Sequence, residues 1–137
     1  MWLYQGVELS EVPTEAISFV YIITNLESGM KYIGKKGFWS KKTKLVNGKK
    51  KKVTSESDWR KYYGSNDRIK ADVKEIGKDK FKREILHVCP SLGVASYLES
   101  KEMFMQGALE RDDFYNIWLS VMVRQDHIKS LQIKTGI

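Results

Sequence analysis

The chain has 137 residues, of which 42% are apolar and 12% aromatic, so we expect one folded domain with a moderate core rather than a disordered chain. No apolar run approaches the roughly 18 residues that span a bilayer, and the single cysteine, Cys89, excludes an internal disulfide and a cysteine-based zinc site and favours the cytoplasm. The net charge is +7, yet residues 31–62 alone carry twelve Lys or Arg and two acids, so a neutral to slightly acidic remainder bears one basic band.

The N-terminal part of the chain predicts an arm followed by a hairpin. Residues 1–17 are interpreted as an arm or edge element that Pro13 interrupts. Residues 19–24 and 30–35 are rich in β-branched and aromatic side chains, and the sequence NLESG between them is typical of a turn. These two segments therefore predict a pair of antiparallel strands.

The predicted hairpin brings two tyrosines to one face of the sheet. If its loop is the four residues 25–28, Tyr21 lies directly opposite Tyr32, and residues opposite each other share a face. Any loop with an even number of residues keeps the two side chains together, whereas an odd number separates them. The register of this hairpin therefore decides whether the two phenols can act at one site.

The basic band continues into a lysine-rich stretch. Residues 41–52 hold seven lysines around an Asn47-Gly48 turn signal and predict either a small hairpin or a mobile loop. A polyanion binder needs such charge because each neutralised phosphate releases counterions. A solvated loop has the same composition, so the charge alone leaves both interpretations open.

Two helices are predicted after the basic stretch. A short helix is expected over residues 58–64, capped by Asp58, and the next begins at the capping residue Ser65 or Asn66. The second helix ends at Gly77, and its apolar side chains recur at helical spacing: Ile69, Val73 and Ile76.

The second half of the chain predicts one more strand and one more helix. Residues 80–88 alternate between two faces and stop before Pro90, and Ser91 then caps a helix to about Leu109. The apolar run over residues 116–123 predicts a last strand or a packed C-terminal segment. The expected fold is therefore α/β, with a small three-stranded, mainly antiparallel central sheet flanked by helices.

Two tyrosine motifs carry a resemblance to a known family. The motif F-V-Y at residues 19–21 is followed, after ten residues, by Y-I-G at residues 32–34, and a W..Y.GS segment occupies residues 59–65. The chain resembles the GIY-YIG nuclease superfamily over roughly residues 18–118, and the third segment resembles its phage homing-type, Seg-like members. In that family the two tyrosine motifs occupy the first two strands, so Ile33 and Gly34 are implied to be structural residues of the second motif.

The sequence departs from the family pattern at two places. Phe19 stands where the first motif has glycine, although Tyr21 is retained. The family has an arginine about eight residues after the Y-I-G glycine, and this position holds Lys42, which lacks the planar fork of arginine. Arg60 is the nearest arginine and would take the role if the lysine-rich stretch is an insertion. Lys42 or Arg60 is thus expected to stabilise the charge on the phosphate.

The resemblance implies phosphodiester hydrolysis, which needs an activated water, a cation on the phosphate and help for the leaving oxygen. Tyr21 or Tyr32 is implied to act as the general base or to assist it. A phenol does so only when its pKa, about 10 in isolation, is lowered. We expect three neighbouring lysines to lower it: Lys31, Lys35 and Lys36.

The resemblance also implies one Mg²⁺ or Mn²⁺ ion held by a helix glutamate. Glu99 matches that residue, because it follows the apolar pair at residues 97–98 on the predicted helix. Glu102 is the alternative, since it lies three residues further along nearly the same helix face. Asn116 matches the family asparagine and is expected to orient the leaving side or the helix around the site.

The predicted function is a Mg²⁺-dependent endonuclease of the GIY-YIG type that cuts double-stranded DNA, with no membrane association and no small-molecule cofactor. The domains expected are an N-terminal arm at residues 1–17, a nuclease domain at residues 18–120 and a short segment at residues 121–137. The oligomeric state is left open. The candidate DNA-binding residues, besides the catalytic ones, are Lys35, Lys36, Lys41, Lys44, Trp59, Lys61, Tyr63 and Ser65.

Two alternatives come from other functional classes. One is a nucleic-acid-binding protein of the same fold without catalysis, in which an aromatic residue such as Trp59 or Tyr63 stacks on bases. The other is a small structural or inhibitor protein with a basic loop, which would show no salt-dependent retention on DNA. Nucleases of the HNH class are disfavoured because the chain holds only two histidines.

Overall fold

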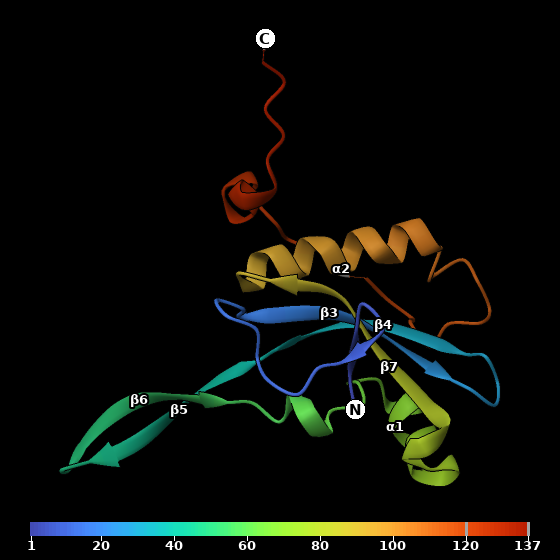
Figure 1. Cartoon of the computed structure of the whole chain (residues 1–137), viewed down its shortest axis with the longest axis horizontal. Helices are drawn as coiled ribbons and strands as arrows, with labels where there is room; N and C mark the ends of the chain where they lie inside the picture. The colour runs from blue at the N-terminus through green and yellow to red at the C-terminus, as the bar shows by residue number, and fades with distance from the viewer. Residues whose placement is uncertain (120, 137) are drawn as a thin grey trace.

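The centre of the molecule is a mixed sheet of five strands in the order β2-β1-β7-β3-β4 (Figure 1). The computed structural model describes residues 1–119 and 121–136. The predicted α/β class is confirmed, but the prediction of three strands is wrong, because the sheet has five. Its strands are β1 (Leu3–Tyr4), β2 (Val7–Glu8), β3 (Ser18–Asn25), β4 (Lys31–Gly37) and β7 (Phe81–Cys89).

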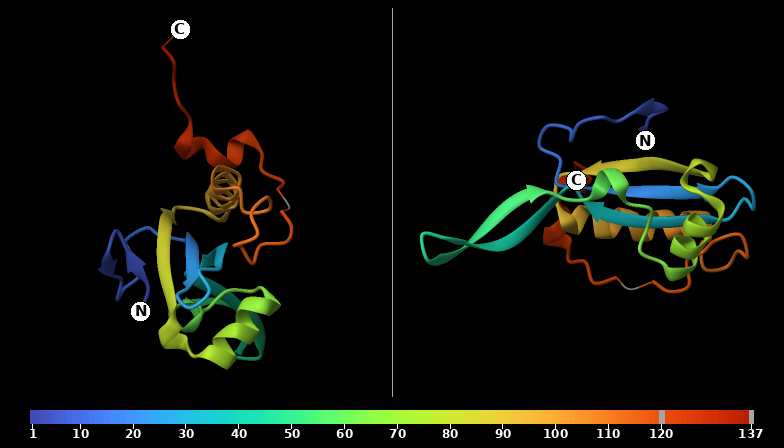
Figure 2. Two further views of the ribbon diagram at one scale, coloured as in Figure 1. Left: turned by 90° about the vertical axis from the view of Figure 1, so that its right-hand side faces the viewer. Right: turned by 90° about the horizontal axis from the view of Figure 1, so that it is seen from below.

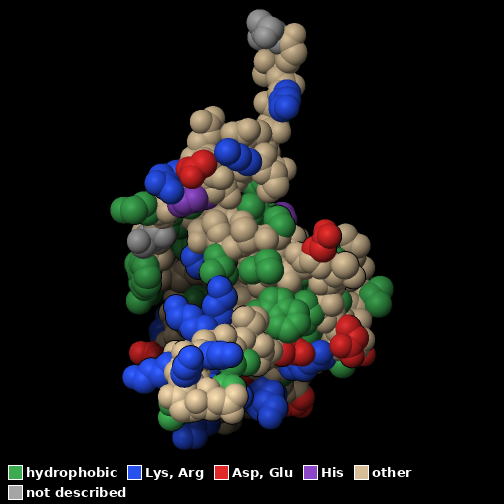
Figure 3. Space-filling view, turned by 90° about the vertical axis from the view of Figure 1, so that its left-hand side faces the viewer, with side chains coloured by type: hydrophobic (Ala, Val, Ile, Leu, Met, Phe, Trp, Pro, Cys, Tyr) green, Lys and Arg blue, Asp and Glu red, His purple; other side chains and the backbone are tan. Residues whose placement is uncertain are grey.

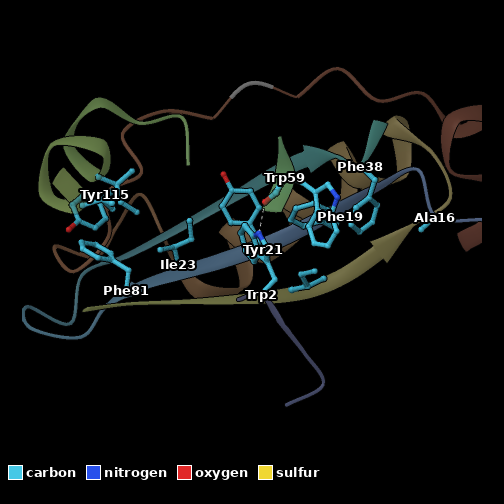
Figure 4. Packing of buried hydrophobic residues seen from close by; sticks show 12 residues of the cluster. Trp2, Ala16, Phe19, Tyr21, Ile23, Phe38, Trp59, Phe81 and Tyr115 are labelled. Carbon is cyan, nitrogen blue, oxygen red and sulfur yellow. Dashed lines mark hydrogen bonds between the residues drawn. The ribbon is translucent and has the colours of Figure 1, made fainter. Parts of the chain in front are cut away.

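The two additional strands come from the N-terminal residues. Strand β1 pairs parallel to β7, with Leu3 opposite Glu84, and β2 pairs antiparallel to β1. The Trp2 indole is 1% exposed and donates from its Nε1 to the carbonyl oxygen of Trp59 at 2.7 Å, as Figure 4 shows. A buried indole removes about 200 Å² from water, on the order of 5 kcal/mol. This contact, distant in sequence, holds the N-terminal residues against the sheet.

The register of the hairpin between β3 and β4 differs from the prediction. Ile23 lies opposite Tyr32, and Tyr21 lies opposite Gly34. The predicted direct opposition of the two tyrosines is wrong, because Asn25 still belongs to β3 and its side-chain oxygen accepts from two backbone N–H groups of the turn. The loop between paired residues is therefore six residues long. Since six is even, the two tyrosines share a face as predicted, with ring centroids 6.1 Å apart.

Helices cover both faces of the sheet (Figures 1 and 2). One face carries the 3₁₀ helix η1 (Trp59–Lys61) and helix α1 (Asp67–Ile76), which is followed by η2 (Lys78–Lys80); the other carries α2 (Leu92–Gln106). Of the two predicted caps for α1, Asn66 is the one used, since its side chain accepts from two backbone N–H groups of the first turn. Ser91 caps α2 as predicted, and Gly107 in the left-handed conformation ends it earlier than expected.

The short helix η1 is smaller than predicted. It spans three residues, and Asp58 stands at its N-cap position without a side-chain hydrogen bond to the helix. The carboxylate of Asp58 instead pairs with the ammonium of Lys36 at 2.7 Å, which lowers the pKa of Asp58. The ion pair therefore takes the place of the expected cap.

Two apolar cores lie on opposite faces of the sheet, and alternate residues of β3 contribute to each. Figure 4 shows the first, which is largely aromatic. Phe19 is central in it, with its ring centroid 4.7 Å from that of Phe38 and 5.1 Å from that of Trp2. The residue that replaces the family glycine thus fills space that a glycine would leave empty.

The basic stretch forms a hairpin of its own. Strands β5 (Trp39–Val46) and β6 (Lys49–Glu56) make a separate two-stranded sheet that extends away from the body of the protein (Figures 1 and 2). Asn47 and Gly48 both have positive φ, as a tight hairpin turn requires. Of the two predicted alternatives, the hairpin is therefore the one adopted. We refer to residues 41–52 as the lysine hairpin.

The chain beyond α2 follows the outer edge of β4. The N–H of Lys31 donates to the Asp113 carbonyl, and the N–H of Tyr115 donates to the Lys31 carbonyl at 2.7 Å. Residues 116–123 were expected to form a last strand or a packed segment. Their described residues, which do not include Ser120, form no strand, and most of their apolar side chains are exposed. The following η3 (Gln125–Leu131) packs against α2. No helix in the described ranges combines the length and apolar character needed to cross a membrane.

Candidate active site

A pocket of about 460 Å³ opens at the outer edge of β4. Since β4 is the last strand of the sheet, elements from both faces can meet at this edge. The wall combines β4, the N-terminal end of α1, helix α2 and the segment that follows α2: Tyr32, Ile33, Lys35, Ser65, Asn66, Glu99, Met103, Asn116, Ile117, Trp118 and Leu119.

One helix acid lies in this pocket. Glu99 of α2 lines the wall, and burial raises the pKa of its carboxyl while the nearby Lys35 lowers it. The alternative, Glu102, does not line the pocket. Its carboxylate is engaged by His87 Nε2 at 2.8 Å and by the Gln106 side-chain amide at 2.9 Å. The geometry therefore favours Glu99 over Glu102 as the acid of the site.

The two tyrosines of the hairpin have different environments. The hydroxyl of Tyr32 reaches the pocket and lies 3.0 Å from the Ser65 hydroxyl. Tyr21 lies entirely within the core and does not line the pocket. Among the buried side-chain polar atoms of the described residues, its hydroxyl is the one that has no hydrogen-bond partner. Tyr32 is thus the phenol that can reach a substrate.

Burial raises the pKa of both tyrosines above 10. For Tyr32 the hydrogen bond with Ser65 opposes this rise. The prediction that neighbouring lysines lower these values is wrong, because their ammonium groups point to other partners. These partners are Asp113 for Lys31 at 3.9 Å, Asp58 for Lys36 at 2.7 Å and the Ser96 hydroxyl for Lys35 at 2.7 Å.

A steric constraint explains why the Y-I-G motif needs a glycine at position 34. Gly34 faces Tyr21 across the hairpin, and the tyrosine ring lies over the glycine Cα. A Cβ at Gly34 would stand 2.5 Å from the ring Cζ of Tyr21 and closer still to its hydroxyl, a distance that real Cβ atoms do not reach. The two motifs are therefore coupled by packing: the tyrosine of the first requires the glycine of the second.

The cation in the pocket is Lys35. It is the one Lys or Arg among the described residues that line the wall. Lys42 lies on the lysine hairpin, away from the pocket. The guanidinium of Arg60 is held by Glu56 at 2.7 Å and by the Ser10 carbonyl, so neither expected cation lines the site. Lys35 comes directly after the Y-I-G motif, although the sequence analysis assigned it to DNA binding and to lowering the tyrosine pKa and not to the phosphate charge.

Asn116 holds the main chain of the second motif. Its Oδ1 accepts from the N–H of Ile33 at 3.0 Å, and its Nδ2 donates to the carbonyl of the same residue at 2.8 Å. Both polar groups of the Asn116 side chain thus bond the backbone of β4, as the N–H and C=O groups of a neighbouring strand would. This contact ties the segment that follows α2 to β4 and so holds the part of the pocket wall that contains Asn116.

A family of known proteins matches most of the chain. The family model described as "Putative endonuclease segE, GIY-YIG domain" matches residues 2–119. The chain belongs to this GIY-YIG family. The predicted resemblance to Seg-like GIY-YIG nucleases is therefore confirmed, and membership indicates a nuclease. A search of curated proteins and a search of solved structures each found no match.

The remaining candidate residues of the GIY-YIG domain divide between several places. Ser65 lines the pocket, whereas Lys41 and Lys44 are exposed on the lysine hairpin. Trp59 is 1% exposed, and its Nε1 donates to Glu56 at 2.7 Å, so its ring packs in the core instead of facing a nucleic acid.

A second hollow of about 320 Å³ collects further basic residues of the GIY-YIG domain. Lys61 and Tyr63, both candidates for DNA binding, line it together with two more lysines, Lys70 and Lys78. Lys36 lies beside it, with its ammonium 4.3 Å from the ring centroid of Tyr62. Phosphates that flank the pocket would meet positive charge here.

Sequence reasoning missed several apolar residues of the pocket, two of which are exposed. Ile117 and Trp118 follow Asn116 directly, line the wall and are mostly exposed. In the sequence they belong to an apolar run that predicts a strand or packed segment. Their position next to the family asparagine was the one signal that could have placed them at the site.

The pocket fits one hard metal ion better than a zinc centre. In the part of the chain that the structure covers, no group of three or more His, Cys, Asp or Glu side chains could hold a metal. Glu99 is the one carboxylate among the described residues of the wall. Mg²⁺ keeps several waters and is usually bound by one or two carboxylates plus substrate phosphate, whereas Zn²⁺ needs three or four protein ligands.

Proposed function

We propose that this GIY-YIG domain is an endonuclease of the homing type that hydrolyses phosphodiester bonds of double-stranded DNA with one Mg²⁺. One observation carries the proposal: Tyr32, Lys35 and Glu99, from two different elements, line the same open pocket. These residues supply a phenol, a cation and a carboxylate, which are the group types that the hydrolysis needs.

The proposed reaction is an in-line displacement at phosphorus. The oxygen of a water forms a bond to phosphorus, the bond from phosphorus to one sugar oxygen breaks, and that oxygen takes a proton from a second, solvent water as it leaves. Tyr32 orients the water through its hydroxyl and accepts the water proton when its phenol is ionised. The ammonium of Lys35 stabilises the negative charge on the phosphate oxygens.

Glu99 would hold the Mg²⁺ together with the scissile phosphate. Bound there, the ion would supply a Lewis acid for the phosphate and positive charge that lowers the pKa of nearby water and phenol groups. Asn116 acts indirectly in this scheme, since its side chain is committed to Ile33 and holds the segment that follows α2 against β4.

The lysine hairpin would hold the DNA outside the pocket. Figure 3 shows the lysine and arginine side chains gathered at the end of the molecule where the hairpin projects. Residues 40–55 include no acid, and Lys44 lies directly opposite Lys51. Like charges facing each other destabilise a hairpin, so a bound polyanion would relieve this repulsion.

The second candidate function is DNA binding without cleavage. One observation favours it: burial raises the pKa of Tyr21 and Tyr32, so neither phenol is activated by the protein's own groups. The two functions differ in whether any divalent metal produces strand breaks.

Nicking of supercoiled plasmid tests the proposal. We expect cleavage in Mg²⁺ that stops in EDTA and falls at least about a hundredfold in Glu99→Gln, because a charged ligand is lost. Glu102→Gln is the matched control, since it makes the same change on the same helix outside the pocket. Equal cleavage by both variants would show that Glu99 is not the metal ligand. Binding of DNA without cleavage by the wild type in Mg²⁺, Mn²⁺ or any other divalent metal would establish the second function.

A further inference from the structure

An exposed indole stands at the wall of the candidate active site. Trp118 is 70% exposed and lines the pocket that contains Glu99. Two other tryptophans, Trp2 and Trp59, are each 1% exposed and serve the core. Phe104 is exposed to a similar extent, at 71%, but it does not line the pocket, whereas Trp118 shares the pocket wall with the polar residues of the site. The surroundings of Trp118 therefore indicate what it can bind.

The chain on both sides of Trp118 is anchored. Two residues before it, Asn116 makes two hydrogen bonds to Ile33. One residue after it, Leu119 packs against the core on the α2 face. Ile117 and Trp118 between these anchors stay exposed. The indole is therefore presented to the pocket from a fixed piece of backbone.

We propose that Trp118 stacks on a nucleobase of the nucleotide next to the scissile phosphate, with Ile117 extending the apolar surface. This inference rests on the proposed function, because it takes the phosphate to lie beside Lys35 and Glu99. The ligand class is an unstacked base of DNA, since an indole that contacts a base face must replace one of its neighbours in the stack. Trp118 is a positioning residue in this scheme and performs no proton transfer.

The size and polarity of the pocket support a nucleotide. A volume of about 460 Å³ lies within the range of small-molecule sites and exceeds what a phosphate alone would fill. Among the described residues, its wall includes one cation, Lys35, together with the hydroxyl of Ser65 and the indole of Trp118. Positive charge for a phosphate beside an aromatic face for a base is the combination by which proteins hold single-stranded nucleic acid.

Tryptophan fluorescence reports this contact directly. The probe is a sixteen-residue oligothymidylate, and the protein carries Glu99→Gln so that the DNA stays intact. We expect the oligonucleotide to quench the emission, and Trp118→Phe to lose most of the quenching while it keeps affinity within about threefold, because a phenyl ring still stacks. Trp118→Ala should weaken binding about tenfold or more.

Trp39→Phe is the matched control. Trp39 is the other partly exposed tryptophan, at 42%, and its Nε1 donates to the Ala16 carbonyl at 3.0 Å, away from the pocket. This variant should keep the quenching. Quenching that survives Trp118→Phe, or that Trp39→Phe removes, would overturn the proposal. So would sedimentation that shows Trp118-dependent self-association without DNA, because a second copy would then cover the indole.

Failure of the stacking and failure of the proposed function give different results. If the wild type nicks plasmid in Mg²⁺ and Trp118→Ala nicks it equally well, the nuclease stands and the stacking is wrong. If no metal produces cleavage but Trp118→Phe abolishes the quenching, the base contact stands and the nuclease proposal is wrong. Trp118→Phe should also restore most of the cleavage that Trp118→Ala loses, which a merely structural role would not require.

Discussion

The lysine hairpin and the pocket at β4 handle charge in opposite ways. The hairpin carries seven lysines in twelve residues, all exposed, on a two-stranded element that extends from the body. The pocket has one lysine and one glutamate, both held among groups anchored to the sheet. Abundant, loosely arranged charge suits attraction of a polyanion, whereas a few groups fixed in place suit a reaction. Substitutions in the two regions should therefore change different quantities.

The largest effect is expected from the pocket cation. Lys35→Met should reduce the cleavage rate at saturating DNA by about a hundredfold or more, since it removes the charge beside the phosphate. Lys44→Met on the hairpin is the matched control and should leave that rate within about twofold. Single-turnover cleavage with excess enzyme measures both. If Lys35→Met and Lys44→Met lowered the cleavage rate to a similar extent, the pocket and the lysine hairpin would not differ in function as described.

The hairpin should control affinity and its salt dependence. Replacement of four exposed lysines by glutamine, at positions 44, 49, 50 and 51, should weaken duplex binding about tenfold or more at low salt. The slope of log K against log salt should become shallower by roughly 0.9 for each phosphate that the variant no longer neutralises. Fluorescence anisotropy across a salt series measures both quantities. An unchanged slope would show that the hairpin does not touch DNA.

The two tyrosines offer a finer comparison within the site. Tyr32→Phe should lower cleavage at least about tenfold without a large change in stability, because its hydroxyl reaches the pocket. Tyr21→Phe removes a buried hydroxyl that has no partner and should raise the free energy of unfolding by about 1 kcal/mol. Denaturant titration and plasmid nicking separate these outcomes. If Tyr21→Phe had a higher free energy of unfolding but lost cleavage, the buried phenol of Tyr21 would have a role in catalysis.

The smallest effect is expected from Cys89 in the core. Its influence on the free energy of unfolding is small at neutral pH and grows as the pH rises. Burial raises the pKa of Cys89 from 9.0 to about 11. As pH rises above 9, the unfolded thiol ionises while the folded thiol stays protonated, so the thiol's contribution to folding decreases up to about pH 11. Between pH 8 and 10.5 the free energy of unfolding of the wild type should fall relative to Cys89→Ala by about 2 kcal/mol. If the free energies of unfolding of the wild type and Cys89→Ala changed in parallel with pH, the thiol would not be buried and protonated as described.

Local signals in the sequence predicted much of the fold. The Asn47-Gly48 turn, the Asn66 and Ser91 caps and the even hairpin loop all act through neighbouring residues, and the structure contains each of them. For residues 1–17 the sequence predicted an arm or edge element without strand bounds, because β1 and β2 are two residues long and depend on the burial of Trp2 against residues far along the chain.

The candidate site could be predicted only in part. Motif order indicated Tyr21 or Tyr32 and, on the helix, Glu99 with Glu102 as its alternative; of these, Tyr32 and Glu99 line one pocket. Counting eight residues from the Y-I-G glycine led to Lys42, which lies on the projecting hairpin, whereas the pocket cation, Lys35, follows the motif directly on β4. The pKa directions depend on burial, which the sequence does not reveal, and Trp118 was hidden in an apolar run whose exposure became visible only in three dimensions.

The hydrogen bonds between Asn116 and Ile33 also cover the edge of β4 against the addition of a strand from another chain. An edge strand with free N–H and C=O groups is a template on which a foreign strand can add. Residues 113–116 occupy that edge of β4 with hydrogen bonds to Lys31 and Ile33. Solubility and the shape of the pocket thus depend on the same few hydrogen bonds, so a chain that lost this segment would be prone to aggregate as well as to lose its binding wall.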